Sequence, residues 1–173
     1  MSAAGADTDA MTTTDRPTLR GMIAADRAPI ERILKATGVF FDDEVAVALE
    51  LFDIARDRRG QTDYIFLCAD VGGRLAGYAC YGPVPMTDRT FDLYWIAVDP
   101  NLHGRGVGRA LLDAMEGDLK ARGARKVFIE TGGRDAYAPT RRFYEATGYT
   151  VAARLPGFYR EGDDKYVFMK DLS

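Results

Sequence analysis

The stretch that most restricts the fold lies at residues 93–112, LYWIAVDPNLHGRGVGRALL. It begins as an apolar strand ending at Val98, turns, and opens a helix through the glycine-rich run 103–108. Glycines lack a Cβ atom and let backbone N–H groups approach a ligand, while a helix N-terminus adds unpaired donors and a partial positive charge. The segment therefore predicts a cradle for phosphate groups, with Arg105 and Arg109 adding formal charge.

The glycine spacing excludes two common phosphate-binding patterns. Arg109 stands at the third glycine position of G-x-G-x-x-G, and no G-x-x-x-x-G-K-[ST] occurs in the chain. Neither a Rossmann fingerprint nor a P-loop is therefore present. A glycine-rich helix start without a ligand remains the alternative interpretation.

The net charge and the hydropathy of the chain argue against two classes of binding partner, nucleic acids and membranes. A formal net charge of −3 and a pI near 5.2 argue against nucleic-acid binding, which normally leaves a basic footprint. No apolar run reaches the roughly 18 residues of a membrane helix, and the first residues lack a secretory pattern, so no membrane partner is expected. Cys68 and Cys80 lie in apolar stretches without metal-binding spacing. These two cysteines indicate a cytoplasmic protein whose thiols are reduced and which has no metal site.

The patterning predicts a disordered tail at residues 1–16 and a single domain at 17–173. A strand–helix–strand unit in the middle of the chain forces parallel pairing, so we expect an α/β (α+β) fold with a central mixed sheet of six to seven strands and helices on both faces. The helix at 42–59 is apolar on two faces, which a homodimer would satisfy. Strands are expected at 18–23, 64–71, 74–81, 90–98, 126–131, 149–155 and 165–171, and helices at 26–38, 42–59, 107–123 and 139–147.

On these residues the chain resembles the GNAT superfamily of acetyl-CoA-dependent N-acetyltransferases, whose loop is usually written Q/R-x-x-G-x-G/A. Residues 103–108 fit this pattern except at His103, and the resemblance extends from about residue 18 to 172. It implies a GNAT fold, pyrophosphate on the loop amides, and pantetheine between two splayed strands at 91–98 and 127–131. The cofactor-binding residues it implies are Ile96, Ala97, Val98, His103, Gly104, Arg105, Gly106, Val107, Gly108, Arg109, Thr131, Tyr137 (where many relatives carry Asn) and Arg141.

The implied reaction is direct attack of an amine through a tetrahedral intermediate. An alkylamine with a pKa near 10.4 costs about 4 kcal/mol to deprotonate at pH 7, whereas the pKa of a thiol, near 8.5, lies only about 1.5 units from pH 7, or about 2 kcal/mol. Deprotonation of the amine is therefore the larger demand. By resemblance Tyr144 is the general acid, and Glu130 is the base, directly or through water, as in the branch that acetylates ribosomal-protein N-terminal alanine. A backbone N–H near Val98 is expected to face the oxyanion. The alternatives are a packing role for Tyr144 and an ion pair to an arginine for Glu130.

The acceptor is predicted from two loops that line this side in the family, residues 39–43 and 157–164. Their aromatic residues can shape a small pocket, Asp42, Asp163 or Asp164 can attract an ammonium, and Arg160 or Arg154 can receive a carboxylate. The mixed signs favour a small amine such as an amino acid. A peptide N-terminus and a non-catalytic acyl-CoA-binding module are the alternatives. The predicted substrate-binding residues are Phe40, Phe41, Asp42, Tyr81, Tyr94, Tyr159 and Arg160.

Overall fold

The structure, a computed structural model, describes residues 16–173; the tail predicted at 1–16 lies outside this range except for its last residue. The order of strands and helices is the one predicted from the sequence, with three single-turn 3-10 helices added. The elements are β1 Thr18–Gly21, η2 Ala24–Asp26, α1 Arg27–Thr37, α2 Asp42–Asp57, β2 Ile65–Val71, β3 Arg74–Pro83, β4 Thr90–Val98, η3 Pro100–Leu102, α3 Val107–Ala121, β5 Lys126–Gly132, η4 Asp135–Tyr137, α4 Ala138–Ala146, β6 Thr150–Arg160 and β7 Asp163–Asp171.

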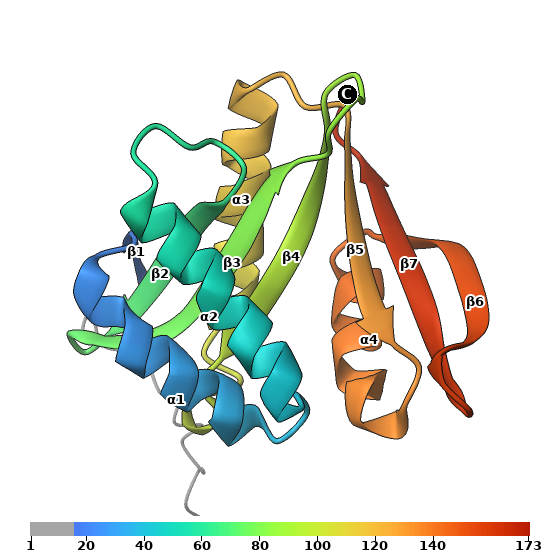
Figure 1. The fold of residues 1–173 in the computed structure, drawn as a ribbon, viewed down its shortest axis with the longest axis horizontal. Helices are drawn as coiled ribbons and strands as arrows, with labels where there is room; N and C mark the ends of the chain where they lie inside the picture. The colour runs from blue at the N-terminus through green and yellow to red at the C-terminus, as the bar shows by residue number, and fades with distance from the viewer. Residues whose placement is uncertain (1–15) are drawn as a thin grey trace, which may run out of the picture.

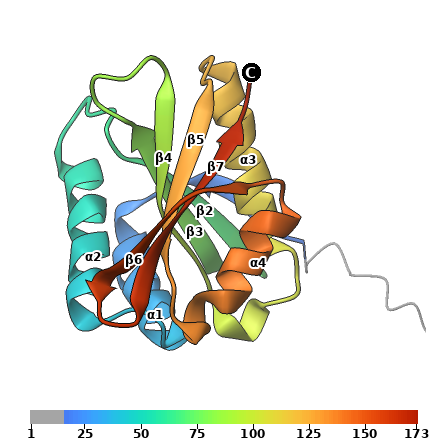
Figure 2. The same ribbon diagram turned by 90° about the vertical axis from the view of Figure 1, so that its right-hand side faces the viewer.

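The described strands form one seven-stranded sheet in the order β1-β2-β3-β4-β5-β7-β6. β4 and β5 pair in parallel, because α3 carries the chain back between them, and the other neighbours pair antiparallel. Helices α1 and α2 cover one face, and α3 and α4 cover the other (Figure 2). The predicted mixed α/β sheet with helices on both faces is confirmed.

β4 and β5 are paired over only part of their length. Their register runs from Thr90 opposite Lys126 to Leu93 opposite Ile129, although β4 continues to Val98 and β5 to Gly132. Beyond this point the two strands separate (Figure 1). Their C-terminal halves are therefore left without each other as hydrogen-bond partners, and the sheet is open beside the start of α3.

A bulge in β4 decides which of its side chains reach this opening. The register with β3 shifts between Cys80 and Tyr81, which leaves Tyr94 as the extra residue. Phe91 and Leu93 pack in the core beneath α3, whereas Tyr94 packs with α1 and α2. Since side chains alternate along a strand, Asp92 lies on the α1 and α2 face.

The final hairpin differs from the prediction. Strands were expected at 149–155 and 165–171 with a loop between them, but β6 continues to Arg160, β7 begins at Asp163, and these two residues pair. Gly162 makes this tight turn possible with a φ of 78°, in the left-handed region. Pro156 is tolerated because β6 is an edge strand, where a missing N–H breaks no ladder bond.

Gly117 offers a test of the helix that carries the glycine-rich loop. It lies on the exposed side of α3, and an added Cβ would meet nothing within 4 Å. We expect Gly117→Ala to raise the free energy of unfolding in urea by about 0.5–1 kcal/mol, because alanine loses less backbone entropy in a helix. Gly77→Ala is the control: its Cβ would lie 2.8 Å from the Ala97 carbonyl oxygen, so stability should fall. A loss in both variants would contradict the expectation.

Candidate active site

A cleft of about 1000 Å³ lies where β4 and β5 separate. Its walls come from the α1–α2 link and the start of α2, the end of β4, the glycine-rich loop, the end of β5 with the segment after it, α4, and the tip of the β6–β7 hairpin. Segments far apart in the sequence thus meet at one opening in the sheet. Sites of this shape and size are typical of small-molecule and cofactor binding.

The glycine-rich loop presents backbone donors to the cleft. Gly104 and Gly106 adopt φ values of 77° and 75°, and an added Cβ at either would enter open space. Helix α3 begins at Val107 with Gly106 as its N-cap and no side-chain cap, so its first N–H groups are left for a ligand. The His103 ring lies against the turn, with Nε2 3.3 Å from the Val98 carbonyl oxygen. The loop therefore fits a pyrophosphate group.

Most of the cofactor-binding residues named from the sequence line this cleft. Two do not: Arg105 is outside the lining, and Arg141 donates to the carbonyl oxygens of Gly132 and Arg134 at 2.7 and 3.1 Å. Arg141 therefore braces the segment that follows β5. Those that line the cleft are Ile96, Ala97, Val98, His103, Gly104, Gly106, Val107, Gly108, Arg109, Thr131 and Tyr137.

Tyr144 of α4 lines the cleft while being only 3% exposed. Its ring packs against Tyr149 and Phe168, with centroids 6.0 and 5.5 Å away. No residue in the described range accepts or donates a hydrogen bond at its hydroxyl. Burial raises the pKa of Tyr144 well above the usual range. The hydroxyl consequently stays protonated near neutral pH, as a proton donor must.

Glu130 lines the cleft, and its partner is a lysine rather than the arginine that the sequence suggested. Lys165 Nζ of β7 lies 2.6 Å from Glu130 Oε2. Asp92 of β4 was missed in the sequence, although it is the one charged residue of the apolar strand TFDLYWIAV. Burial, with repulsion from Glu130 as the second cause, raises the pKa of Asp92 to about 6. A carboxyl group that titrates this close to neutral pH is suited to accepting a proton.

Two arginines stack on one aromatic ring at the end of the cleft formed by the α1–α2 link and the β6–β7 hairpin. Phe41 of the α1–α2 link lies beneath the guanidinium carbons of Arg134 and Arg160, at 4.6 and 4.2 Å from its ring centroid. Arg134 also donates to the Val39 carbonyl oxygen and forms an ion pair with buried Asp163. Arg160 has no carboxylate partner in the described part of the chain. Its guanidinium is therefore held in place with its N–H groups available.

Several acceptor residues named from the sequence lie elsewhere. Tyr81 is buried under α3, where its hydroxyl donates to Asp118 at 2.7 Å, because side chains alternate along β3 and its neighbour Cys80 takes the opposite face. Asp42 is exposed outside the lining. Asp164 is paired with Arg154 at 2.6 Å. The remaining four, Phe40, Phe41, Tyr94 and Tyr159, line the cleft together with Arg160.

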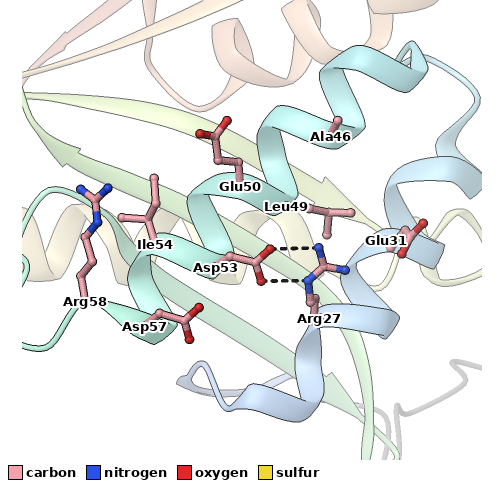
Figure 3. Close-up of a pocket in the computed structure, with 9 residues that line it drawn as sticks. All are labelled: Arg27, Glu31, Ala46, Leu49, Glu50, Asp53, Ile54, Asp57 and Arg58. Atoms are coloured by element: carbon pink, nitrogen blue, oxygen red, sulfur yellow. Dashed lines mark hydrogen bonds and ion pairs between the residues drawn. The ribbon is translucent and has the colours of Figure 1, made fainter.

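A second, smaller pocket of about 540 Å³ lies between α1 and α2 (Figure 3). Its lining is mostly charged and shares no residue with the cleft. Arg27 donates to both carboxylate oxygens of Asp53, at 2.8 and 2.9 Å. These groups satisfy each other at the surface, so the pocket offers nothing that the chemistry of the cleft requires.

One cleft thus joins a helix start that fits pyrophosphate to a buried tyrosine hydroxyl and a carboxylate, an arrangement suited to group transfer from a phosphate-bearing cofactor. Residues 30–149 match the model of the Acetyltransferase (GNAT) family. The chain therefore belongs to the GNAT family, and the predicted fold and family are confirmed. Members of this family are acetyltransferases that use acetyl-CoA.

Among the relatives is the mycothiol acetyltransferase of Beutenbergia cavernae, 36% identical over 110 residues that cover 61% of this chain and 36% of that protein. The [ribosomal protein bS18]-alanine N-acetyltransferase of Escherichia coli K12 is 31% identical over 93 residues, covering 54% of this chain and 60% of that protein. A crystal structure from Desulfovibrio desulfuricans assigned to the GNAT family has a TM-score of 0.84 and 42% identity, covering 91% of this chain and 99% of that one. The chain thus spans only part of the length of the two curated relatives.

None of the helices within residues 16–173 is long and apolar enough to cross a membrane.

Proposed function

We propose that this chain transfers the acetyl group of acetyl-CoA to the primary amine of a small molecule such as an amino acid. The observation that carries the proposal is the cleft itself, which joins the uncapped start of α3 to Tyr144 of α4 and to Glu130 of β5. When bound, acetyl-CoA supplies an acetyl group activated as a thioester. The amides of residues 103–109 would hold its pyrophosphate, and the end of β4 from Ile96 to Val98, which pairs with β3 but not with β5, would hold its pantetheine arm.

The chain's own residues supply the proton transfers. The proton acceptor that an ammonium needs before its nitrogen can attack is Glu130, which lines the cleft, together with Asp92 on the neighbouring strand, which lies outside the lining. Tyr144 holds a proton at its hydroxyl inside the cleft, where a departing thiolate can take it. The acceptor and the donor of protons are different residues on different elements, so neither group has to serve both steps.

The narrow acceptor end favours a small substrate. The link before α2 is tied to the segment after β5 by two hydrogen bonds to the Val39 carbonyl oxygen, from Arg134 at 3.0 Å and from the Tyr137 hydroxyl at 3.3 Å. Arg160 crosses from the hairpin to Phe41 of the same link. Contacts across the mouth leave less room for an extended peptide than an open groove would.

Arg160 supports an acceptor that carries a carboxylate. We expect Arg160→Ala to raise the KM for amino acids by about ten- to a hundredfold, since a charged hydrogen bond contributes roughly 1.5–3 kcal/mol. The KM for an amine without a carboxylate should stay within about twofold. Arg154→Ala is the matched control, because Arg154 pairs with Asp164 outside the cleft lining. An equal rise for both kinds of amine would argue against carboxylate recognition.

The second candidate is acetylation of a protein or peptide N-terminus, favoured by the similarity to the alanine N-acetyltransferase of E. coli. The third is a module that binds acyl-CoA without turnover. Thiol release from acetyl-CoA, measured over free amino acids, simple amines and short peptides, separates all three. Turnover on peptides alone would favour the second, and binding of CoA without thiol release on any amine would favour the third.

Compartment and assembly belong to the same proposal. Cys68 and Cys80 are free and buried, which supports a reducing compartment such as the cytoplasm. A homodimer through α2 rests on the two apolar faces of that helix in the sequence, since its exposed Val47 lines the cleft. Sedimentation of the full chain tests the assembly.

A further inference from the structure

Three charged side chains from three strands share one face of the sheet beside the cleft. The register pairs Asp92 of β4 with Phe128 of β5, Glu130 of β5 with Val167 of β7, and Gly132 with Lys165. Because directly opposed residues point to the same face and side chains alternate along a strand, Asp92, Glu130 and Lys165 lie on the α1 and α2 face. The opposite face of β5 packs Val127 and Ile129 beneath α3.

The side chain of Lys165 is held in place by burial and by two contacts. Its side chain is 14% exposed, whereas that of Glu130 is 54% exposed. Its ammonium lies 2.6 Å from Glu130 Oε2 and 4.6 Å from the centroid of the Phe158 ring. A short charge-assisted contact and a cation–π contact together hold one positive charge at the base of an otherwise acidic pair.

We propose that Lys165 is a positioning residue for an Asp92–Glu130 carboxylate pair that accepts the proton of the acceptor ammonium. Lys165 holds the Glu130 carboxylate in place at the cleft wall through the 2.6 Å ion pair and keeps the net charge of the three groups at −1 rather than −2. The N–H bond of the ammonium breaks, its electron pair stays on nitrogen, and the proton passes to a carboxylate oxygen of the pair. This inference rests on the proposed function, because it assigns the proton acceptor of the same reaction.

The charged groups around Asp92 decide in which direction loss of the Lys165 charge moves the pH dependence of activity. Asp92 faces Glu130 from β5 and Lys165 from β7, with Tyr94 on its own strand and Cys80 and Asp63 close to Tyr94. Burial and Glu130 raise the pKa of Asp92 to about 6, and Lys165 opposes this rise. Two interacting carboxyl groups titrate as a pair, and the pair accepts a proton only when ionised. Activity should therefore rise with pH around 6, and loss of the lysine charge should move that rise to higher pH.

The test is the pH profile of kcat/KM for Lys165→Met against Lys165→Arg. We expect Lys165→Met to move the acidic limb up by about one pH unit, since an opposite charge at close range shifts a carboxyl pKa by about 1–3 units. Activity at pH 6 should then fall about fivefold, because the ionised fraction drops from about one half to about one tenth, and activity at pH 9 should stay within about twofold of wild type. Lys165→Arg keeps the charge and should keep the limb. Lys120→Met, on the exposed side of α3, controls for the loss of a lysine elsewhere.

A second measurement needs no turnover. Carboxyl-carbon NMR of the free protein should show a group of the pair titrating near pH 6 in wild type and at higher pH in Lys165→Met, with thermal denaturation confirming that the variant folds. An unmoved limb together with an unmoved carboxyl titration would overturn the positioning role. Absence of thiol release from the wild-type chain on every amine would instead count against the proposed function, while the NMR titration would still test the carboxylate pair.

Discussion

Tyr144→Phe is expected to lower kcat by about a hundredfold while the affinity for acetyl-CoA stays within about twofold, since general-acid catalysis contributes roughly 10²–10⁴. The substitution removes one hydroxyl and keeps the ring that packs against Tyr149 and Phe168. Because no protein group in the described range shares that hydroxyl, its loss leaves no buried partner unsatisfied. Steady-state kinetics and calorimetric titration with acetyl-CoA measure the two quantities separately.

The matched control is the neighbouring tyrosine. Tyr149 is as buried as Tyr144, but its hydroxyl donates to Glu116 at 3.0 Å and lies outside the cleft lining. Tyr149→Phe should reduce stability by about 1 kcal/mol with kcat unchanged. If Tyr144→Phe kept kcat within about threefold of wild type, Tyr144 would be a packing residue only, which is the alternative that the sequence left open.

The order of strands and helices could be predicted from the sequence because the spacing of apolar residues changes where a strand gives way to a helix. The apolar alternation of β4 gives way to helical spacing in α3 after one glycine-rich turn, and the parallel pairing follows from that. The strand bounds predicted for the final hairpin were too short. A proline and two glycines in residues 156–162 suggest a loop, but the edge strand β6 continues through them, with its pairing to β7 interrupted between Leu155 and Arg160.

The site was harder to predict, because the face of the sheet to which each side chain points depends on the register of the strands. Alternation along β3 points Tyr81 toward α3, and one extra residue in β4 puts Tyr94 and Asp92 on the other face; no local pattern reports such a bulge. Lys165 and Glu130 are 35 positions apart in the sequence and lie on two strands, β7 and β5, that only the sheet order brings together. Asp92 did carry a signal, as a lone charge in an apolar strand. Because burying a carboxylate is costly, such a charge is a functional candidate on the strength of the sequence alone.

Gly106→Val is expected to weaken acetyl-CoA binding by at least about a hundredfold, with the loss appearing in affinity rather than in the chemical step. Gly106 has a φ of 75° as the N-cap of α3, and its missing Cβ leaves open space at the mouth of the amide cradle. A branched side chain would occupy the place of the pyrophosphate and would cost roughly 1–2 kcal/mol in the left-handed region. Calorimetry with acetyl-CoA measures the affinity.

The control variant Gly73→Val distinguishes two effects of Gly106→Val, backbone strain and a side chain that blocks the pyrophosphate site. Gly73, in the β2–β3 turn, has the same φ of 75° and the same open space around a built Cβ, but it lies outside the cleft lining. Both variants should lose similar stability in urea, because each forces a branched residue into the left-handed region. Only Gly106→Val should lose affinity for acetyl-CoA. If the two variants bound acetyl-CoA equally well, the amides at the start of α3 would not be the pyrophosphate site.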